Sequence, residues 1–217
     1  MSLSKHMKLD YWECYAKIVL EYFFPERYSN LTLSDKPDLI CEINETGIEV
    51  TSAIPRDKRE AETLWIDIPN VDNEKKKYNI ERMEQLGYKY TGGIQFWNIN
   101  SFDVSPSIAH KQFAPFFSIF ERKVKKLNSG NYKILSQYDL FIHSEMHILD
   151  MQCENILNEL IKLNNGYRYV YVTTNTNDLY IFNLYENTWL KVDDKIFDKY
   201  QSIFSKKANK LVELGEQ

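Results

Sequence analysis

Two short apolar segments joined by a polar turn constrain the fold of this chain more than any other feature. The first lies in residues 35–40, and the second covers residues 47–51, in which apolar and polar side chains alternate. A period of two is typical of a half-buried strand, so we expect a β-hairpin here. Its apolar face holds Leu39, Cys41, Ile48 and Val50, which leaves Asp38 and Glu49 on the other face.

The register of this hairpin decides whether the two carboxylates meet. If residues 42–45 form the loop, Asp38 lies opposite Glu49, with Cβ atoms about 5 Å apart. If residues 44–47 form the loop, Asp38 lies opposite Ala53 instead, and the carboxylates are separated. The apolar face is the same in both registers. Gly47 near the turn favours the second register unless a bulge intervenes.

Two carboxylates held close together on a sheet repel one another, and a divalent cation between them relieves that repulsion. Hard oxygen ligands of this kind suit Mg²⁺ or Mn²⁺. The alternative is a plain surface hairpin, because an Asp at a strand start and a Glu on the solvent face are common in α/β domains. Both readings stay open at this point.

The composition is that of one soluble globular domain. The chain has 217 residues, of which 43% are hydrophobic and 27% charged, and no linker divides it. We therefore expect a single domain over residues 1–217, with a loose start at residues 1–8. No apolar run reaches the length of a membrane span, and no signal-peptide pattern is visible. Three scattered cysteines fit a reducing compartment, so we expect a cytoplasmic protein that does not bind membranes.

Hydrophobic periodicity predicts a mixed α/β chain. Residues 55–91 are polar and poorly periodic, which predicts an insertion with one or two short helices. A long helix over residues 107–127 contains Pro115, which predicts a kink or a broken start. The remaining helices are expected at residues 9–24, 149–163 and 195–211, and the remaining strands at residues 28–33, 92–97, 138–143, 167–173 and 178–184.

At Pro37, Asp38 and Glu49 the chain resembles the PD-(D/E)XK nuclease-like (restriction-endonuclease-like) superfamily. The motif of that superfamily is Pro-Asp on one strand and Glu-x-Lys on the next; here Thr51 stands where the lysine usually stands. The expected order of helix, short strand, hairpin, long helix and strand is also that of the family's core. The resemblance covers roughly residues 10–54 and 107–145. It implies an α/β fold with a mixed sheet, to which the last third adds strands and helices.

The resemblance implies a metal-dependent nuclease with Mg²⁺ or Mn²⁺ as cofactor. Asp38, Glu49 and the main-chain carbonyl of Val50 are the implied metal ligands. A glutamate of the first helix often completes such a site. Glu21 is the expected one and Glu13 the second choice, although both also fit a solvated stripe along that helix.

Thr51 can donate a hydrogen bond but carries no charge, so it cannot replace the electrostatic role of the motif lysine. In some branches of the superfamily a lysine of the long helix takes over this role. Lys123 is therefore the expected substitute, with Lys126 second. The ordinary alternative for each is a lysine whose stem lies along the apolar edge of its helix.

Three functions follow from these observations. The first is a phosphodiesterase that cleaves nucleic acid, with DNA expected ahead of RNA. The second is a catalytically inactive relative that serves as a binding or assembly module, for which Thr51 and the net charge of −4 argue. The third is an unrelated α/β protein. The oligomeric state stays open; a homodimer is one expectation, because many nucleases of this fold pair to cut both strands.

Overall fold

The computed structural model describes residues 10–54, 56–88, 90, 106–130 and 132–215. The chain divides into two compact units: Met1–Ala53 together with Phe116–Gln217, and Ile54–Pro115. The sequence led us to expect one domain with an insertion at residues 55–91. The smaller unit covers that segment and extends beyond it.

The larger unit is built on a mixed sheet of seven strands in the order β1-β2-β3-β4-β5-β6-β7. The three central strands, β3 to β5, are parallel, and the outer strands pair antiparallel. Parallel neighbours require crossover connections, and helices supply them here. The strands are β1 (Thr32–Leu33), β2 (Leu39–Cys41), β3 (Thr46–Ser52), β4 (Gln137–Ser144), β5 (Tyr167–Thr174), β6 (Leu179–Asn183) and β7 (Thr188–Lys191).

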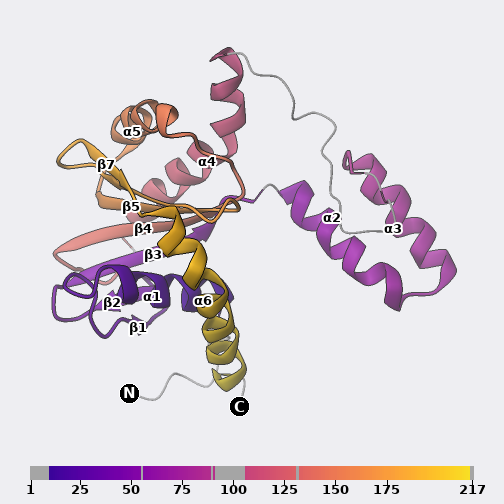
Figure 1. Cartoon of the computed structure of the whole chain (residues 1–217), viewed down its shortest axis with the longest axis horizontal. Coiled ribbons are helices and arrows are strands. Elements are labelled where there is room, and N and C mark those ends of the chain that lie inside the picture. Colours follow the sequence, from indigo (N-terminus) through magenta and orange to yellow (C-terminus); the bar gives the residue numbers. More distant parts are fainter. Residues whose placement is uncertain (1–9, 55, 89, 91–105, 131, 216–217) are drawn as a thin grey trace. The chain divides into compact units, whose positions relative to one another are not determined.

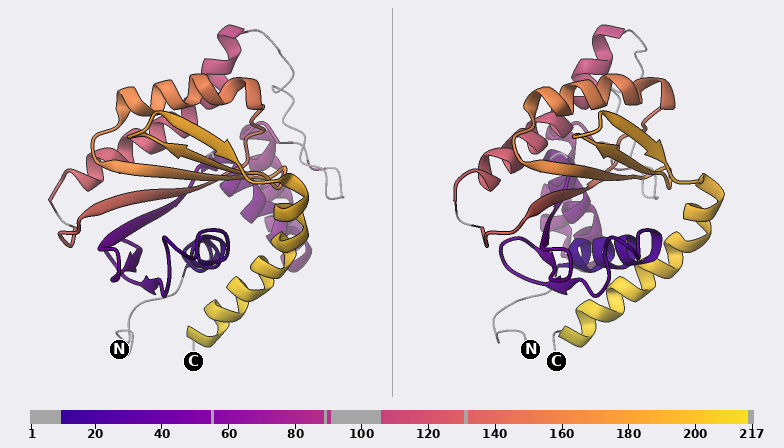
Figure 2. Two further views of the ribbon diagram at one scale, coloured as in Figure 1. Left: turned by 60° about the vertical axis from the view of Figure 1, so that its left-hand side comes forward. Right: turned by 90° about the vertical axis from the view of Figure 1, so that its left-hand side faces the viewer.

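Helices cover both faces of this sheet (Figures 1 and 2). Helices α1 (Tyr11–Phe23) and α6 (Asp194–Gly215) lie on one face, and α4 (Pro106–Leu127) and α5 (Asp150–Leu163) lie on the other. The α/β class with a mixed sheet is therefore confirmed. Helix α4 continues through Pro115 rather than starting after it. Strand β7 was not expected from the sequence, and the strand expected at residues 92–97 lies outside the described residues.

The apolar face of the hairpin packs against α1 and α6. Asp10 begins α1 by accepting a hydrogen bond from the Trp12 main-chain N–H at 2.7 Å, as an N-cap residue does. The helix then buries a stripe of side chains on β2 and β3. The shared core includes Val19 and Leu20 of α1, Phe204 of α6, and the four expected hairpin residues Leu39, Cys41, Ile48 and Val50.

The register of the hairpin corrects the expectation drawn from Gly47. Leu39 pairs with Ile48, and Cys41 pairs with Thr46, so residues 42–45 form the loop. Glu45, with φ of 47°, takes the left-handed conformation in the turn. Gly47 instead lies inside β3, where a Cβ atom would come within 2.6 Å of Pro37 Cγ. This glycine is needed for close packing rather than for a turn.

A buried polar network fixes β4 against β5 and the chain after α1. Asp139 on β4 is fully buried, and its carboxylate accepts hydrogen bonds from the Tyr28 hydroxyl at 2.6 Å and the Tyr169 main-chain N–H at 2.9 Å. The hydroxyls of Tyr28 and Tyr171 lie 2.8 Å apart, and Arg27 donates to Tyr171 at 2.7 Å. Burial raises the pKa of Asp139 to about 6, although these donors oppose the rise.

The smaller unit contains helices α2 (Arg56–Asp67) and α3 (Asn73–Gln85), joined by a short 3₁₀ turn, η1 (Ile68–Asn70). Asp72 begins α3 by accepting a hydrogen bond from the Lys75 main-chain N–H. The two helices pack on a small core of their own, formed by Ala61, Ile68, Met83 and Tyr88.

The close approach at Gly47 makes a stability prediction. In Gly47→Ala the added methyl group meets Pro37 and also lies 2.9 Å from Leu135 Cδ1 and Tyr138 Cδ1. Overpacking of this kind costs about 1–3 kcal/mol, so we expect a lower midpoint of urea unfolding. Thr188→Ala, at an exposed position of β7, is the control. Equal midpoints for Gly47→Ala and the wild type would contradict the expectation.

Candidate functional site

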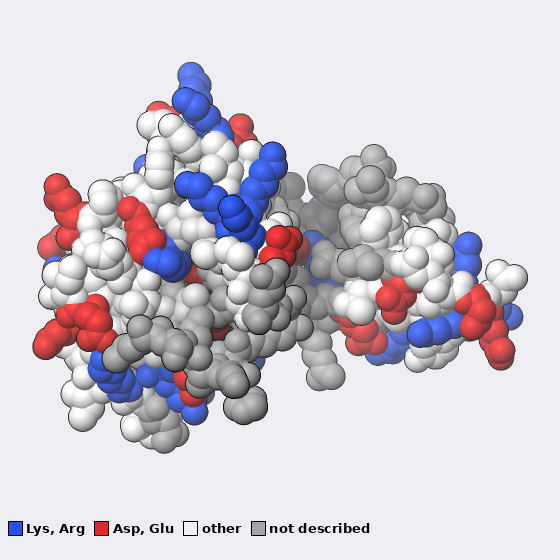
Figure 3. Space-filling view, turned by 90° about the horizontal axis from the view of Figure 1, so that it is seen from below, with Lys and Arg blue, Asp and Glu red and all other residues white. Residues whose placement is uncertain are grey.

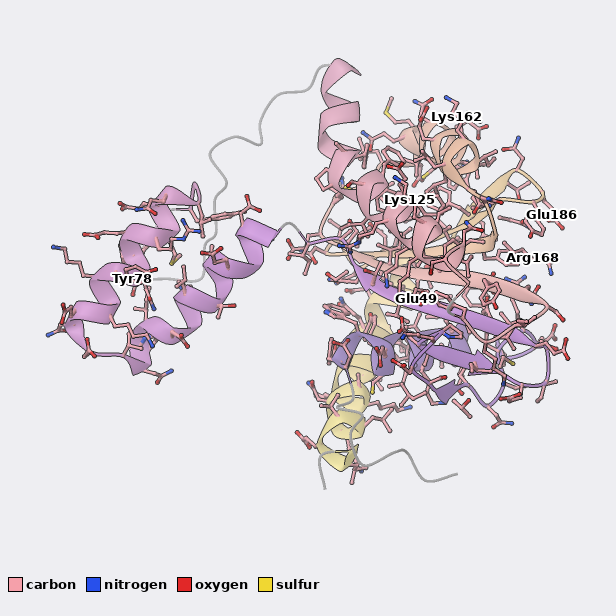
Figure 4. All side chains as sticks on the ribbon, turned by 180° about the vertical axis from the view of Figure 1, so that it is seen from behind. Glu49, Tyr78, Lys125, Lys162, Arg168 and Glu186 are labelled. Atoms are coloured by element: carbon pink, nitrogen blue, oxygen red, sulfur yellow. The ribbon has the colours of Figure 1, made fainter. Side chains whose placement is uncertain are left out.

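Glu49 on β3 is the centre of a charged cluster in the larger unit (Figure 4). Its side chain is only 1% exposed. The Oε1 atom accepts hydrogen bonds from the ammonium groups of Lys123 and Lys126, each at 2.6 Å, and Oε2 accepts one from the Tyr132 hydroxyl at 2.6 Å. Burial alone would raise the pKa of Glu49, but Lys123, Lys126 and Tyr132 together hold it below its ordinary value.

Both lysines come from α4, whose apolar stripe packs against the sheet. Phe120, Val124 and Leu127 are buried, and Lys123 and Lys126 lie three residues apart, so both project from the same side of the helix. Lys123 also donates to the main-chain carbonyl of Val50 at 3.0 Å. Its ammonium group therefore contacts the side chain of Glu49 and the backbone of the next residue.

Asp38 lies beside this cluster because the hairpin adopts the register with residues 42–45 in the loop. Its Oδ2 atom accepts a hydrogen bond from the Val50 main-chain N–H at 2.6 Å. Burial and the charge of Glu49 raise the pKa of Asp38 to about 6, against the opposing effects of that hydrogen bond and the two lysines. The structure thus brings together Asp38, Glu49, Val50 and Lys123.

Of the two candidate glutamates of α1, Glu13 is the one whose pKa is affected by Asp38 and Glu49, whereas the expected Glu21 is engaged by other partners. The Glu21 carboxylate accepts hydrogen bonds from Lys17 and from the Leu31 main-chain N–H. Glu13 has its pKa raised to about 7 by burial, then by the charge of Asp38, with smaller contributions from Asp10 and Glu49. The two glutamates lie about 12 Å apart along the helix axis. The spacing of side chains around a helix shows which face they share, but it does not show which of them lies level with Glu49.

Thr51 follows Glu49 by two residues, so its side chain points to the same face of β3. Thr51 is neutral, and the ammonium groups that contact Glu49 come from Lys123 and Lys126 on α4. Tyr132, whose hydroxyl donates to Glu49, was not expected from the sequence as a site residue. It lies in the loop after α4, where no periodicity indicates the direction of a side chain.

The donor atoms of the cluster suit a hard cation. Asp38, Glu49 and the Val50 carbonyl offer oxygens only, which Mg²⁺ and Mn²⁺ prefer. Burial first, and then repulsion between carboxylates, raises the pKa values of Asp38 and Glu13. In the described part of the chain, no group of three or more His, Cys, Asp and Glu side chains could hold a metal ion. A cation here would therefore rest on two carboxylates and one carbonyl, and would compete with the lysines for Glu49.

The surface carries charges of both signs. Figure 3 shows lysine and arginine side chains interspersed with carboxylates on one face of the molecule. Among the described helices, none is both long and apolar enough to cross a membrane.

The raised pKa of Glu13 predicts how stability depends on pH. Between its ordinary value of 4.5 and its folded value of about 7, the folded protein holds more protons on this carboxyl than the unfolded chain does. The contribution of Glu13 to stability is thus fully present below 4.5 and is lost as the pH rises through 7. We expect Glu13→Gln to gain stability over the wild type at about pH 8 and less at about pH 5, measured by urea unfolding. A constant difference between the two proteins would contradict the assignment.

The contacts of Glu49 predict the cost of removing its charge. In Glu49→Gln two ammonium groups face a neutral amide, so we expect a loss of about 2 kcal/mol in the free energy of unfolding. Glu121→Gln is the matched control, because its ion pair with Lys125 is exposed and should contribute less than about 1 kcal/mol. Equal losses in the two variants would show that the contacts of Glu49 contribute no more to stability than an exposed ion pair does.

No protein-family model, curated protein or solved structure matches this chain. The functional assignment therefore depends on the geometry of the cluster around Glu49.

Proposed function

We propose that this chain is a metal-dependent phosphodiesterase that cleaves nucleic acid, with Asp38 and Glu49 as its central carboxylates. The observation that carries the proposal is the position of Lys123, whose ammonium group lies 2.6 Å from Glu49 Oε1 and 3.0 Å from the Val50 carbonyl. A lysine from α4 thus supplies the charge that Thr51 lacks. This arrangement supports a nuclease site in which the motif lysine has moved from the strand to a helix.

The order of elements also supports the proposal. Helix α1, strand β1, the β2–β3 hairpin, helix α4 and strand β4 follow one another as in a restriction-endonuclease-like core, once residues 54–115 are set aside. Strands β5 to β7 and helices α5 and α6 are additions to that core. Shared element order is a fold-level analogy, so it adds to the site geometry without replacing it.

Hydrolysis of a phosphodiester needs an activated water, positive charge near the phosphate and a proton for the departing oxygen. A Mg²⁺ or Mn²⁺ ion held by Asp38, Glu49 and the Val50 carbonyl would lower the pKa of a bound water and polarise the phosphate. Lys123, fixed by two acceptors, orients the attacking water and stabilises developing negative charge. Glu13, with a pKa of about 7, is suited to exchanging a proton near neutral pH.

The second candidate is a catalytically inactive relative that acts as a binding or assembly module. The contacts of Glu49 favour it, because two lysines and Tyr132 already engage both carboxylate oxygens without any cation. The net charge of −4 agrees with a role other than general coating of nucleic acid.

Cleavage assays with Mg²⁺ or Mn²⁺ test the proposal on linear duplex DNA, single-stranded DNA and RNA. We expect the wild type to cleave DNA faster than RNA. Glu49→Gln and Lys123→Ala should each lose about 100-fold in rate, because each removes charge that acts on the transition state. Lys125→Ala, on the exposed side of α4, should cleave like the wild type.

Circular dichroism of each variant separates lost chemistry from lost folding. Folded wild-type protein that cleaves none of the substrates and shows no Mn²⁺ binding by calorimetry would refute the enzyme and favour the binding module. Cleavage that persists in folded Glu49→Gln would place the active site elsewhere.

A further inference from the structure

The two lysines on Glu49 are held in different ways. Lys123 is 12% exposed and donates to two acceptors, Glu49 Oε1 and the Val50 carbonyl. Lys126 is 43% exposed, and its described contacts are Glu49 Oε1 and the ring of Tyr132, whose centroid lies 5.4 Å from Nζ. The ammonium group of Lys123 is therefore held by two acceptors on β3, whereas that of the more exposed Lys126 has one hydrogen-bond acceptor on β3, the same Glu49 Oε1.

The sharing of one oxygen makes the Lys126 contact the weaker of the two. Two ammonium groups bound to Oε1 lie close together and repel one another. The exposed partner gains least from its ion pair, because water screens the attraction and the free side chain regains its rotamer freedom. A lysine is a point charge on a flexible stem, so Lys126 can turn to another acceptor without moving α4.

Tyr132 keeps Glu49 in place when Lys126 leaves. Its hydroxyl donates to the second oxygen, Oε2, at 2.6 Å, and burial together with the Glu49 charge raises the pKa of Tyr132. The phenol therefore remains a donor at any pH near neutrality. With Tyr132 on Oε2 and Lys123 on Oε1, the carboxylate retains its orientation without Lys126.

We propose that Lys126 is an exchangeable counter-ion, which holds Glu49 in the free protein and moves to a phosphate oxygen when a nucleic acid strand binds. The inference rests on the proposed function and assigns the two lysines of α4 separate tasks: Lys123 acts at the reacting phosphate, and Lys126 binds the strand. Its departure would leave Lys123 as the one ammonium group on Oε1 and so lower the positive charge that opposes a divalent cation there, which would couple the binding of cation and nucleic acid.

Binding of a fluorescein-labelled 20-base-pair DNA duplex, measured by anisotropy in Ca²⁺ over a range of salt concentrations, tests the task of Lys126. Loss of one phosphate contact should weaken binding by Lys126→Gln about tenfold and make the salt dependence shallower by about one unit. Lys125→Gln is the matched control; its lysine is 73% exposed and pairs with Glu121, so binding should match the wild type. Lys126→Arg keeps the charge and should retain the wild-type salt dependence.

Calorimetric titration with MnCl₂, without nucleic acid, tests the exchange itself. Lys126→Gln removes a competitor for Glu49 and should bind Mn²⁺ a few-fold more tightly than the wild type, whereas Lys125→Gln should not. Equal duplex affinity, salt dependence and Mn²⁺ affinity for the two variants would overturn the inference while leaving cleavage by the wild type intact. A wild type that binds neither the duplex nor Mn²⁺ would overturn the proposed function as well.

Discussion

A carboxylate buried inside a sheet-and-helix interface is the constraint on which the larger unit depends. Removing Glu49 from water is costly unless donors replace the lost hydration, and here three do so. Two of the donors belong to α4 and the third to the loop after it. The apolar stripe of α4 fixes how far the helix lies from β3, and the Glu49 contacts fix which side of it faces the strand. Packing and electrostatics thus select the same arrangement.

The pKa values of Glu49 and of the carboxyl groups near it are shifted in opposite directions. The pKa of Glu49 is lowered, whereas burial and mutual repulsion raise those of Asp38 and Glu13 to about 6 and about 7. Neighbouring acids whose pKa values are pushed apart are a common property of sites that hold a cation or transfer a proton. The buried Asp139 also has a raised pKa, but Tyr28 and Tyr169 engage it and tie strands together. The raised pKa of Asp139 therefore fits a structural role, whereas those of Asp38 and Glu13 accompany the charged cluster around Glu49.

The sequence predicted the parts of this structure that depend on periodicity. Alternation placed Glu49 and the apolar hairpin face correctly, and helical spacing placed Lys123 and Lys126 on one side of α4. Periodicity shows on which face of a strand or helix a side chain lies. It does not show how two strands pair in register, or how far along the helix axis a side chain lies. Both hairpin registers bury the same side chains; the observed one is accompanied by the fit of Gly47 against Pro37 and by the hydrogen bond from the Val50 N–H to Asp38. Glu13 and Glu21 share a stripe of α1 in the same way, and Tyr132, in a loop, has no periodic signal at all.

Between β3, which carries Glu49, and α4, which carries its lysines, the chain forms helices α2 and α3, which pack on a core of their own. Closing a longer flexible loop costs little, about 0.6 kcal/mol for each doubling of its length. If the intervening chain were a flexible loop instead, the stability of the Glu49 contacts would depend little on its length. The connection between β3 and α4 is thus a point at which a shorter linker could replace the α2–α3 segment while Lys123 and Lys126 still reach Glu49.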